Sequence, residues 1–368
     1  MLPRTPNRGV QRGLEAQGFI SIRVLKLAAM VRVRFAPSPT GSLHLGGALV
    51  AVANRRFADE HGGTLLLRID DTDPARNVPG GEDAIVADLE WLGTRWDEGP
   101  VRQSERQERY REAASRVGVD RFHGYTLRRD DGTATYHLAS VVDDADFGIS
   151  HVIRGADHRS NEALHRRLHE AVGSDPPEYL YVGLMLGPDG KKLSKRDHGV
   201  ASIADLGEAG IPPEAVRAYL EELGLPRGDV HLDRKRLRRL STDALAALSD
   251  DDLAARAGAP VELAPALRGV RDLNEARELA RVVLEPEESA LLPDAHATLE
   301  RFRVLREVAN GALDEVAARA LIANVRADGG DLHALRLALT GRERGPELWT
   351  IVRALPRDEA LRRVATAL

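Results

Sequence analysis

The architecture follows from one segment, Arg34-Phe-Ala-Pro-Ser-Pro-Thr-Gly-Ser-Leu-His-Leu-Gly-Gly47. Apolar residues alternate with arginines over 31–35, which predicts a strand. The Pro- and Gly-containing loop leads into 48–57, which suits a buried helix. This order of elements presents backbone N–H groups and a helix N-terminus to phosphate, and glycine lets a ligand come close. The segment predicts an α/β nucleotide site, although an ordinary Gly-Gly turn before a helix remains the alternative.

A second apolar run, 64–69, ends in Asp70-Asp71-Thr72-Asp73-Pro74 and predicts a second strand. Three carboxylates in four residues could bind a hard cation. They could equally cap a turn before a helix that begins near Gly81, and we favour this interpretation for Asp71 and Asp73. Asp70 is expected to face a ligand crevice, because open α/β sheets place their sites at the carboxyl ends of strands.

Composition excludes several classes of protein. The 368 residues allow two or three domains, and 43% hydrophobic with 30% charged residues is typical of a globular chain. No run of eighteen apolar residues exists, which excludes a membrane-spanning helix. The absence of cysteine excludes disulfides, thiolate metal sites and cysteine nucleophiles. Because the net charge is −5, a nucleic-acid partner requires a local basic patch.

Lysine is concentrated in one loop. Only five of the 52 basic residues are lysines, and three of them lie within 191–195. A compact ammonium is not interchangeable with a guanidinium, so this loop is a candidate for phosphate binding. A solvated β-turn over 187–190 is the alternative explanation for Lys191 and Lys192.

Five segments, in order along the chain, resemble motifs of the class I aminoacyl-tRNA synthetases in their glutamyl version. They are 34–47, Arg68-Ile-Asp-Asp-Thr-Asp-Pro-Ala-Arg76, Arg102-Gln-Ser-Glu-Arg106, Val152-Ile-Arg-Gly-Ala-Asp-His158 and Lys191-Lys-Leu-Ser-Lys-Arg196. The resemblance implies an α/β fold, with a Rossmann-type parallel-sheet catalytic domain followed by an all-helical C-terminal region.

The resemblance also implies an activity. Glutamate is joined to ATP as glutamyl-adenylate and then transferred to tRNA, in the manner of a glutamate–tRNA ligase. Mg²⁺ is expected on the ATP phosphates rather than in a protein cage, and no zinc is expected. Glutamate and tRNA, most simply tRNA-Glu, are the implied partners. We expect a cytoplasmic protein without membrane contact and favour a monomer.

The same resemblance assigns site residues. His44 and Lys195 are the catalytic candidates, and the resemblance implies that Lys195 contacts the phosphates as its loop closes. The ATP-binding set is Pro39, Thr40, Gly41, His44, Gly46, Gly47, Lys192, Ser194 and Lys195. The amino-acid-binding set is Arg34, Ala36, Ser38, Asp70, Tyr136, Ser140, Arg154 and Asp157. No metal ligand is assigned.

Arg34 and Arg154 are expected to hold the side-chain carboxylate of the substrate, which suits bidentate arginine. Buried in a strand, Arg34 needs an anionic partner, and an internal pair with Asp70 or Asp157 is the alternative. The family usually has Glu at both of these positions. Aspartate keeps the charge but shortens the reach by one methylene, about 1.5 Å, so the specificity for glutamate is less secure than that for the nucleotide.

We expect four parts along the chain. Residues 1–29 are an extension without order or chemistry, 30–200 the catalytic domain, 201–240 a helical linker subdomain, and 241–368 a helical domain resembling anticodon-binding domains. The family's connective insertion is largely missing near 111–130, where some relatives carry a zinc site. Five basic residues within 234–239 form either an RNA-backbone patch or a solvated helix face.

Three hypotheses remain at this point. The first is a compact glutamate–tRNA ligase. The second is a glutamate-activating paralogue that transfers to a modified tRNA base or a non-tRNA acceptor, which the missing insertion favours. The third is a non-catalytic nucleotide- or RNA-binding paralogue, which the joint presence of His44, Lys195, Arg34 and Arg154 disfavours.

Overall fold

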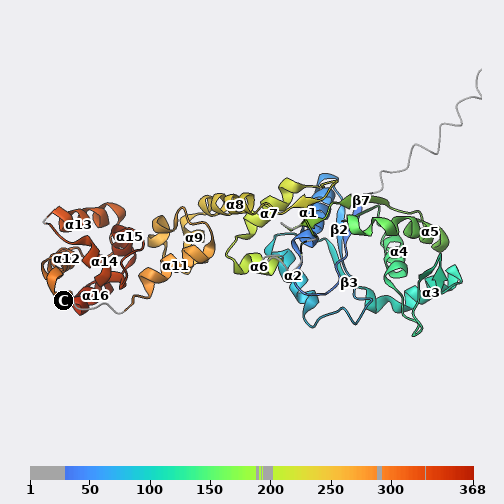
Figure 1. Cartoon of the computed structure of the whole chain (residues 1–368), viewed down its shortest axis with the longest axis horizontal. Coiled ribbons are helices and arrows are strands. Elements are labelled where there is room, and N and C mark those ends of the chain that lie inside the picture. The colour runs from blue at the N-terminus through green and yellow to red at the C-terminus, as the bar shows by residue number, and fades with distance from the viewer. Residues whose placement is uncertain (1–29, 188–189, 192, 194–201, 288–291, 328) are drawn as a thin grey trace, which may run out of the picture.

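The computed structural model describes residues 30–187, 190–191, 193, 202–287, 292–327 and 329–368. Figure 1 shows an elongated molecule with an α/β body at one end and an all-helical body at the other. Helix α8 (Arg234–Ala247) lies between them. The expectation for residues 1–29 lies outside the described residues. No helix in the described part of the chain is long and apolar enough to cross a membrane.

The sheet of the α/β body is parallel. Strands β1 (Arg32–Phe35), β2 (Thr64–Ile69) and β3 (Glu98–Arg102) pair in the order β1-β2-β3. Strands β6 (His151–Gly155) and β7 (Glu178–Val182) form a second parallel pair. The backbone N–H of Ser150 donates to the carbonyl of Arg32 at 2.9 Å, so β6 lies beside β1. The predicted parallel-sheet fold is confirmed.

Helices connect these strands, as parallel pairing requires. They are α1 (Leu45–Glu60), α2 (Gly81–Trp91) and α5 (Glu162–Val172). The helix predicted over 48–57 is confirmed but begins three residues earlier, at Leu45. Its Ala48, Leu49 and Val52 are buried in one core with Val33 of β1. Burying each large aliphatic side chain contributes about 1.5–3 kcal/mol, which fixes the helix against the sheet.

The connection after the third strand is short. Helix α3 (Gln107–Val117) leads into a two-stranded hairpin of β4 (Arg121–Phe122) and β5 (Tyr125–Thr126), and then α4 (Tyr136–Asp146) begins. His123 and Gly124, with φ of 48° and 85°, make the tight turn of this hairpin. A hairpin of this size is all that the described chain holds where the family insertion was expected to be missing.

The C-terminal half is mainly helical. One exception is β9 (Val230–His231), which pairs in parallel with β8 (Met185–Leu186) and differs from the purely helical expectation. The helices before α8 are α6 (Ile203–Glu208) and α7 (Pro213–Leu223). Those after it are α9 (Asp250–Ala257), α10 (Ala264–Leu267), α11 (Leu273–Leu284), α12 (His296–Val308), α13 (Glu315–Ala327), α14 (Leu332–Thr340), α15 (Leu348–Ala354) and α16 (Arg357–Ala367).

Helix α8 crosses the expected boundary at 240/241 without a break. Its Leu237 belongs to the core of the α/β body, whereas Leu245 belongs to the core of the C-terminal helices. One continuous helix therefore joins the two cores, and a division at 240/241 stays a prediction about folding units rather than about secondary structure.

Candidate active site

A cavity of about 320 Å³ lies at the carboxyl ends of β1, β2 and β6, beside the start of α1. Its walls gather residues that the sequence places far apart. They include Arg34, Ala36, Ser38, Thr40, Gly41, His44, Gly46, Gly47, Asp70, Tyr136, Ser140, Arg154 and Asp157 from the predicted sets. The amino-acid and nucleotide sets therefore meet in one place, while the role of each residue stays a prediction.

The remaining predicted residues are one proline that is not in the cavity lining and three residues that the structure does not describe. Pro39 is buried, and its carbonyl accepts the N–H of Val78 at 3.0 Å, which ties the loop to the chain beyond β2. Lys192, Ser194 and Lys195 lie outside the described residues. Next to them, Gly190 N–H donates to the Gly187 carbonyl at 3.0 Å, as in the predicted β-turn.

The start of α1 faces the cavity. A Cβ added at Gly46 would lie 3.8 Å from Met185 and one at Gly47 would lie 3.8 Å from Leu43, which are ordinary contacts. The packing of the protein therefore does not require glycine at either position. Backbone close to a ligand does provide a reason for glycine here, next to N–H groups that favour an anion.

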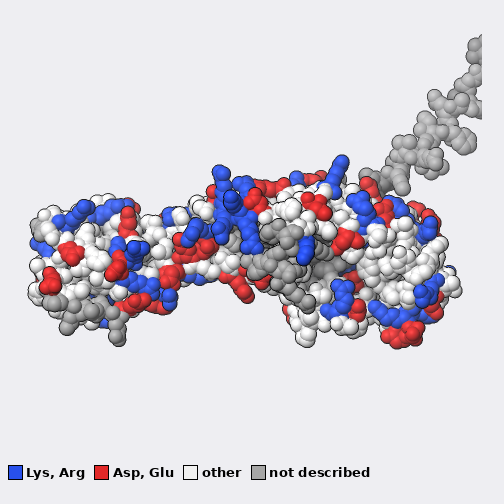
Figure 2. Space-filling model, in the orientation of Figure 1, with Lys and Arg blue, Asp and Glu red and all other residues white. Residues whose placement is uncertain are grey.

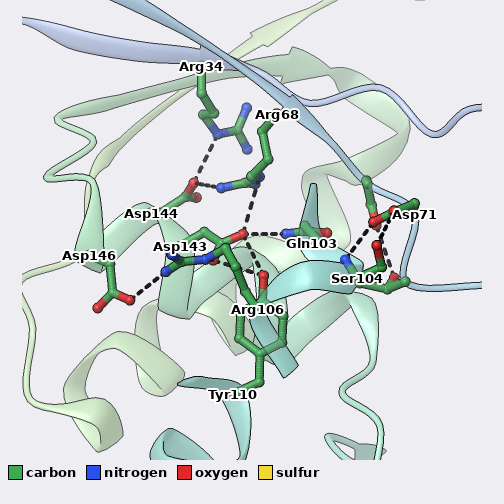
Figure 3. Close-up of polar contacts among 12 residues, drawn as sticks. Arg34, Arg68, Asp71, Gln103, Ser104, Arg106, Tyr110, Asp143, Asp144 and Asp146 are labelled. Atoms are coloured by element: carbon green, nitrogen blue, oxygen red, sulfur yellow. Dashed lines mark hydrogen bonds and ion pairs between the residues drawn. The ribbon is translucent and has the colours of Figure 1, made fainter. Parts of the chain in front are cut away.

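Arg34 is paired inside the protein. Its Nε donates to Asp144 Oδ1 at 3.2 Å, and Arg68 donates from NH1 to the same oxygen at 2.8 Å (Figure 3). The internal pair that the sequence left as the alternative is therefore present, but its partner is Asp144 and not Asp70 or Asp157. The register explains this, because Arg34 is paired with Leu66 and so shares a sheet face with Arg68. Helix α4 covers that face and carries Asp144.

Burial and charge act against each other in this group. Burial and the nearby guanidiniums of Arg68 and Arg154 lower the pKa of Arg34, although Asp144 counteracts them. Burial alone raises the pKa of Asp144, but Arg34 and Arg68 outweigh it and hold that pKa below the usual aspartate value. Asp144 is therefore an anion that fixes the positions of two cations.

Asp143, the preceding residue, anchors a second set of side chains. It is fully buried and accepts hydrogen bonds from Gln103, Arg106 and Tyr110 at 2.7–3.0 Å (Figure 3). These partners come from α3 and the short helical turn before it. The two adjacent carboxylates thus tie α4 both to the sheet, through Arg34 and Arg68, and to α3 and the turn before it.

Arg154 differs from the other buried arginines. It is 5% exposed, and its terminal nitrogens lie 3.4 Å from the hydroxyls of Tyr136 and Tyr181. Its guanidinium also lies over the Tyr179 ring, 4.9 Å from the centroid. Within the described residues no carboxylate pairs with it, and its Nε is buried without a partner. Burial by itself lowers the pKa of Arg154, but the neighbouring tyrosines raise that pKa above its usual value.

A buried cation without a counter-ion is costly, and an anionic ligand in the cavity would relieve that cost. A substrate carboxylate has the planar shape that a guanidinium binds through two hydrogen bonds. The arrangement is therefore suited to a ligand with an anionic group at the Arg154 end of the cavity.

Asp70 supplies negative charge to the same cavity. It follows β2 directly and accepts from the Thr72 hydroxyl at 3.0 Å. Burial raises the pKa of Asp70 above the usual value, although Arg68 and Thr72 oppose that rise. Asp157 lies on the short helical turn Ala156–Asn161 and lines the cavity as well. Carboxylates at the cavity wall can receive a ligand ammonium group.

The neighbouring acidic residues have structural contacts. Asp73 accepts the N–H of Ala75 at 3.3 Å, which confirms the predicted turn. Asp71 instead accepts the N–H of Ser104 at 2.7 Å and its hydroxyl at 2.5 Å, at the start of a short helical turn (Gln103–Arg106) rather than before α2. The described residues hold no group of three or more His, Asp or Glu side chains that could bind a metal.

Sequence reasoning missed four groups around the cavity: Arg68, Arg76, Asp144 and His158. Arg68 could have been predicted from the sequence. It is an arginine inside the apolar strand 64–69, and side-chain alternation places it on the same sheet face as Arg34 in the neighbouring predicted strand. His158 lies four positions after Arg154 in the quoted 152–158 motif but was given no role. Asp144 comes from another element, and no local pattern connects it with Arg34 or Arg154.

Comparisons with known proteins agree on one family. The sequence model described as "tRNA synthetases class I (E and Q), catalytic domain" matches residues 30–117 and 112–232. Glutamate–tRNA ligase 1 of Rubrobacter xylanophilus is 36% identical over 428 residues, covering 93% of this chain and 98% of the relative. The glutamate–tRNA ligase of Methylacidiphilum infernorum is 32% identical, covering 90% and 97%.

A solved structure shows the same fold. The glutamate tRNA ligase from Elizabethkingia meningosepticum, in complex with its amino acid, superposes with a TM-score of 0.69 at 22% identity, covering 92% of this chain and 99% of that one. The alignment with the Rubrobacter protein is longer than the 368-residue chain itself, so the relative has residues without a counterpart here. This chain is a compact member of the class I tRNA synthetase family, and the relatives that it matches are glutamate–tRNA ligases.

Proposed function

We propose that the protein is a glutamate–tRNA ligase. In the first step an oxygen of the glutamate α-carboxylate attacks the α-phosphorus of ATP, and the bond to the departing pyrophosphate breaks. In the second step a ribose hydroxyl of tRNA attacks the glutamyl carbonyl, and AMP leaves. The observation that carries the proposal is the buried guanidinium of Arg154, which has no carboxylate partner among the described residues, in a cavity that both predicted residue sets line.

The cavity suggests how glutamate is oriented. Its side-chain carboxylate binds Arg154 and the terminal nitrogens of Arg34, and its ammonium group binds Asp70. The α-carboxylate is then left to face the phosphates. The rate advantage comes mainly from positioning and from stabilising charge on the phosphate oxygens.

The phosphates are assigned to the opposite wall. His44 and the N–H groups at Gly46 and Gly47 lie at the start of α1, where an anion is favoured. Lys195, which is assigned by its motif alone, adds an ammonium group. Bound on the ATP phosphates, Mg²⁺ would supply further neutralisation of their charge, since phosphate oxygens are its usual ligands.

The α8 patch, defined as Arg234, Lys235, Arg238 and Arg239, supports an RNA partner. All four side chains are exposed on α8, and Figure 2 shows Lys and Arg gathered over that helix. The overall charge of −5 does not attract RNA, so a local cluster of this kind is required. Arg236 is paired with Glu222 and is not part of the patch, and within the patch Arg239 lies 3.9 Å from Asp243.

The first test is glutamate-dependent ATP–pyrophosphate exchange, with glutamine and aspartate as competing substrates, in the presence and absence of host tRNA. We expect exchange with glutamate, followed by charging of one host tRNA. If ATP binds but glutamate supports no exchange under either condition, the proposal is wrong. Exchange without charging of any host tRNA would favour the paralogue with another acceptor, which the short hairpin connection makes the second candidate.

The second test addresses Arg154 directly. Arg154→Gln is expected to lower kcat/KM for glutamate about a hundredfold or more, because the substrate carboxylate then lacks its charged partner. The Kd for ATP should not change. Arg159→Gln is the matched control, because Arg159 is exposed and lies 4.5 Å from the centroid of the same Tyr181 ring that Arg154 contacts. Equal losses in the two variants would contradict the assignment.

A further inference from the structure

Two histidines continue the contacts of Arg154 away from the cavity. His165 of α5 is 1% exposed, and its Nδ1 lies 3.4 Å from Arg154 NH1. On the other side of the ring, His165 Nε2 lies 3.1 Å from Nδ1 of His137, which belongs to α4. Arg154, His165 and His137 thus form a continuous chain of three side chains from three different elements.

The chemistry of these groups gives the chain a direction. A guanidinium has no acceptor, so His165 must accept from Arg154 through Nδ1. The single proton of neutral His165 is then on Nε2, which donates to His137 Nδ1. His137 in turn carries its own proton on Nε2. Each ring is therefore held in one tautomer, assigned by this pattern of donors and acceptors.

The surroundings keep both rings neutral. Burial, with the positive charge of Arg154 and the His137 ring, lowers the pKa of His165 to about 2. Asp144 of α4 opposes this shift, whereas Arg34 of β1 adds to it. Burial, Arg154 and His158 lower the pKa of His137 as well. The Nδ1 acceptor facing Arg154 is consequently present throughout the neutral pH range.

The other contacts of Arg154 are with three tyrosines. The Tyr136 and Tyr181 hydroxyls both lie at 3.4 Å, the Tyr181 hydroxyl donates to Glu162 at 2.9 Å, and the Tyr179 ring contacts only the face of the guanidinium. His165 is fixed at both ring nitrogens and lies in the protein interior. It is therefore a rigid acceptor for Arg154, and rigid neighbours are what hold a binding group in its productive geometry.

We infer that His165, fixed in one tautomer by His137, is a positioning residue that aims the Arg154 guanidinium at the side-chain carboxylate of the substrate. The inference rests on the proposed function, because it assigns Arg154 to glutamate. It adds two residues that do not touch the substrate but determine how well the substrate is recognised.

Substitutions at His165 separate this role from packing. His165→Leu fills similar space without an acceptor, whereas His165→Asn places an amide oxygen near the position of Nδ1. In the exchange assay we expect His165→Leu to raise the KM for glutamate about tenfold to a hundredfold, with the KM for ATP and kcat changed less than twofold. His165→Asn should recover most of the loss.

His169→Leu is the matched control. His169 is also 1% exposed on α5, but its Nδ1 contacts the Ser174 hydroxyl at 2.9 Å and not Arg154. We expect its KM for glutamate to equal that of the wild type even if its melting temperature falls. Equal KM values for His165→Leu and His165→Asn, or equal increases in His165→Leu and His169→Leu, would overturn the inference.

His137 provides a test of the chain itself. His137→Leu should raise the KM for glutamate in the wild type but have no further effect in the His165→Leu background, because it acts only through that ring. Additive effects in the double variant would show that the two histidines act separately and would overturn the proposed chain.

A spectroscopic measurement tests the tautomers of the two histidines without an activity assay. Nitrogen-15 NMR of histidine-labelled protein should show both rings protonated at Nε2 and not at Nδ1, from pH 6 to 8. Removal of Arg154 by Arg154→Gln should alter the His165 signals while leaving those of His169 unchanged. If the wild type shows these tautomers but no glutamate-dependent exchange, the proposed function is wrong, but the hydrogen-bonded series from Arg154 through His165 to His137 is supported. Protonation of His165 at Nδ1 would overturn that series.

Discussion

Arg34 and Asp144 stand 110 positions apart, yet the Arg34 Nε donates to the Asp144 carboxylate at 3.2 Å. The same carboxylate oxygen accepts from Arg68, so one anion fixes two strand arginines beneath the cavity. In the described part of the chain the terminal nitrogens of Arg34 have no hydrogen-bond partner, although Arg34 lines the cavity. The contact with Asp144 therefore fixes Arg34 through its Nε and leaves its terminal nitrogens for a ligand.

Asp144→Asn should destabilise the protein by about 3–5 kcal/mol, because it leaves two buried guanidiniums without their shared charge. Urea unfolding at neutral pH measures this difference. The pKa of Asp144 is lowered in the folded state, so its stabilisation is present above the pKa of the unfolded chain and is lost as pH falls through the folded value. The two proteins should consequently converge in stability under strongly acidic conditions.

Asp146→Asn is the matched control for that prediction. Asp146 also pairs with two arginines, Arg106 and Arg109, but all three side chains are partly exposed. Exposed pairs contribute about 0–1 kcal/mol, so we expect a small effect that weakens further in high salt. A loss in Asp146→Asn as large as in Asp144→Asn would show that burial does not determine the difference.

The sequence predicts which residues form strands, and which face of the sheet each side chain occupies, better than it predicts their hydrogen-bond partners. The limits of β2 at Thr64–Ile69 follow from an apolar run that ends in turn residues. Periodicity also places Arg34 on the face opposite Val33. It cannot identify Asp144 as the partner, because that depends on how α4 packs across the sheet. Burial of Asp144 is likewise a tertiary effect, since an aspartate in a helix is ordinarily exposed.

Asp70 should control the pH dependence of glutamate use. If the ionised carboxylate binds the substrate ammonium, kcat/KM for glutamate falls as pH drops through the pKa of Asp70, which burial raises above the usual value of about 3.9. Asp70→Asn should lower kcat/KM about tenfold to a hundredfold and remove this acidic decline, whereas Asp70→Glu retains the charge. pH–rate profiles of the three proteins test the assignment, and a decline that persists in Asp70→Asn would contradict it.

The same substitution should affect stability in the opposite direction from Asp144→Asn. A raised pKa means that the folded state disfavours the ionised form, so Asp70 costs stability at neutral pH, and this cost disappears as pH falls below the pKa of the unfolded chain. Asp70→Asn is therefore expected to be as stable as the wild type or more stable at pH 7. Thermal unfolding measures the effect, and a lower melting temperature would show that the Asp70 charge is satisfied within the empty protein.

Lys195→Ala should slow ATP–pyrophosphate exchange about a hundredfold or more, because it removes an ammonium group from the developing phosphate charge. Lys26→Ala is the control, since Lys26 is one of the few other lysines and belongs to no motif. Exchange rates at saturating glutamate and ATP compare the two. Equal rates would show that the assignment of the 191–196 motif to phosphate binding is wrong.

The α8 patch should act on tRNA and not on adenylate formation. Replacing Arg234, Lys235, Arg238 and Arg239 by glutamine removes charges that face solvent, so exchange measured without tRNA and folding stability should change little. The KM for tRNA should rise, and the slope of log K against log salt should become shallower by about one for each RNA phosphate that the variant no longer neutralises. Charging assays across a salt series measure both quantities. Substitution of the three arginines by lysine keeps the charge and should retain most of the affinity. If the glutamine variant charges tRNA like the wild type at every salt concentration, these residues form a solvated helix face, and RNA must be bound through another surface.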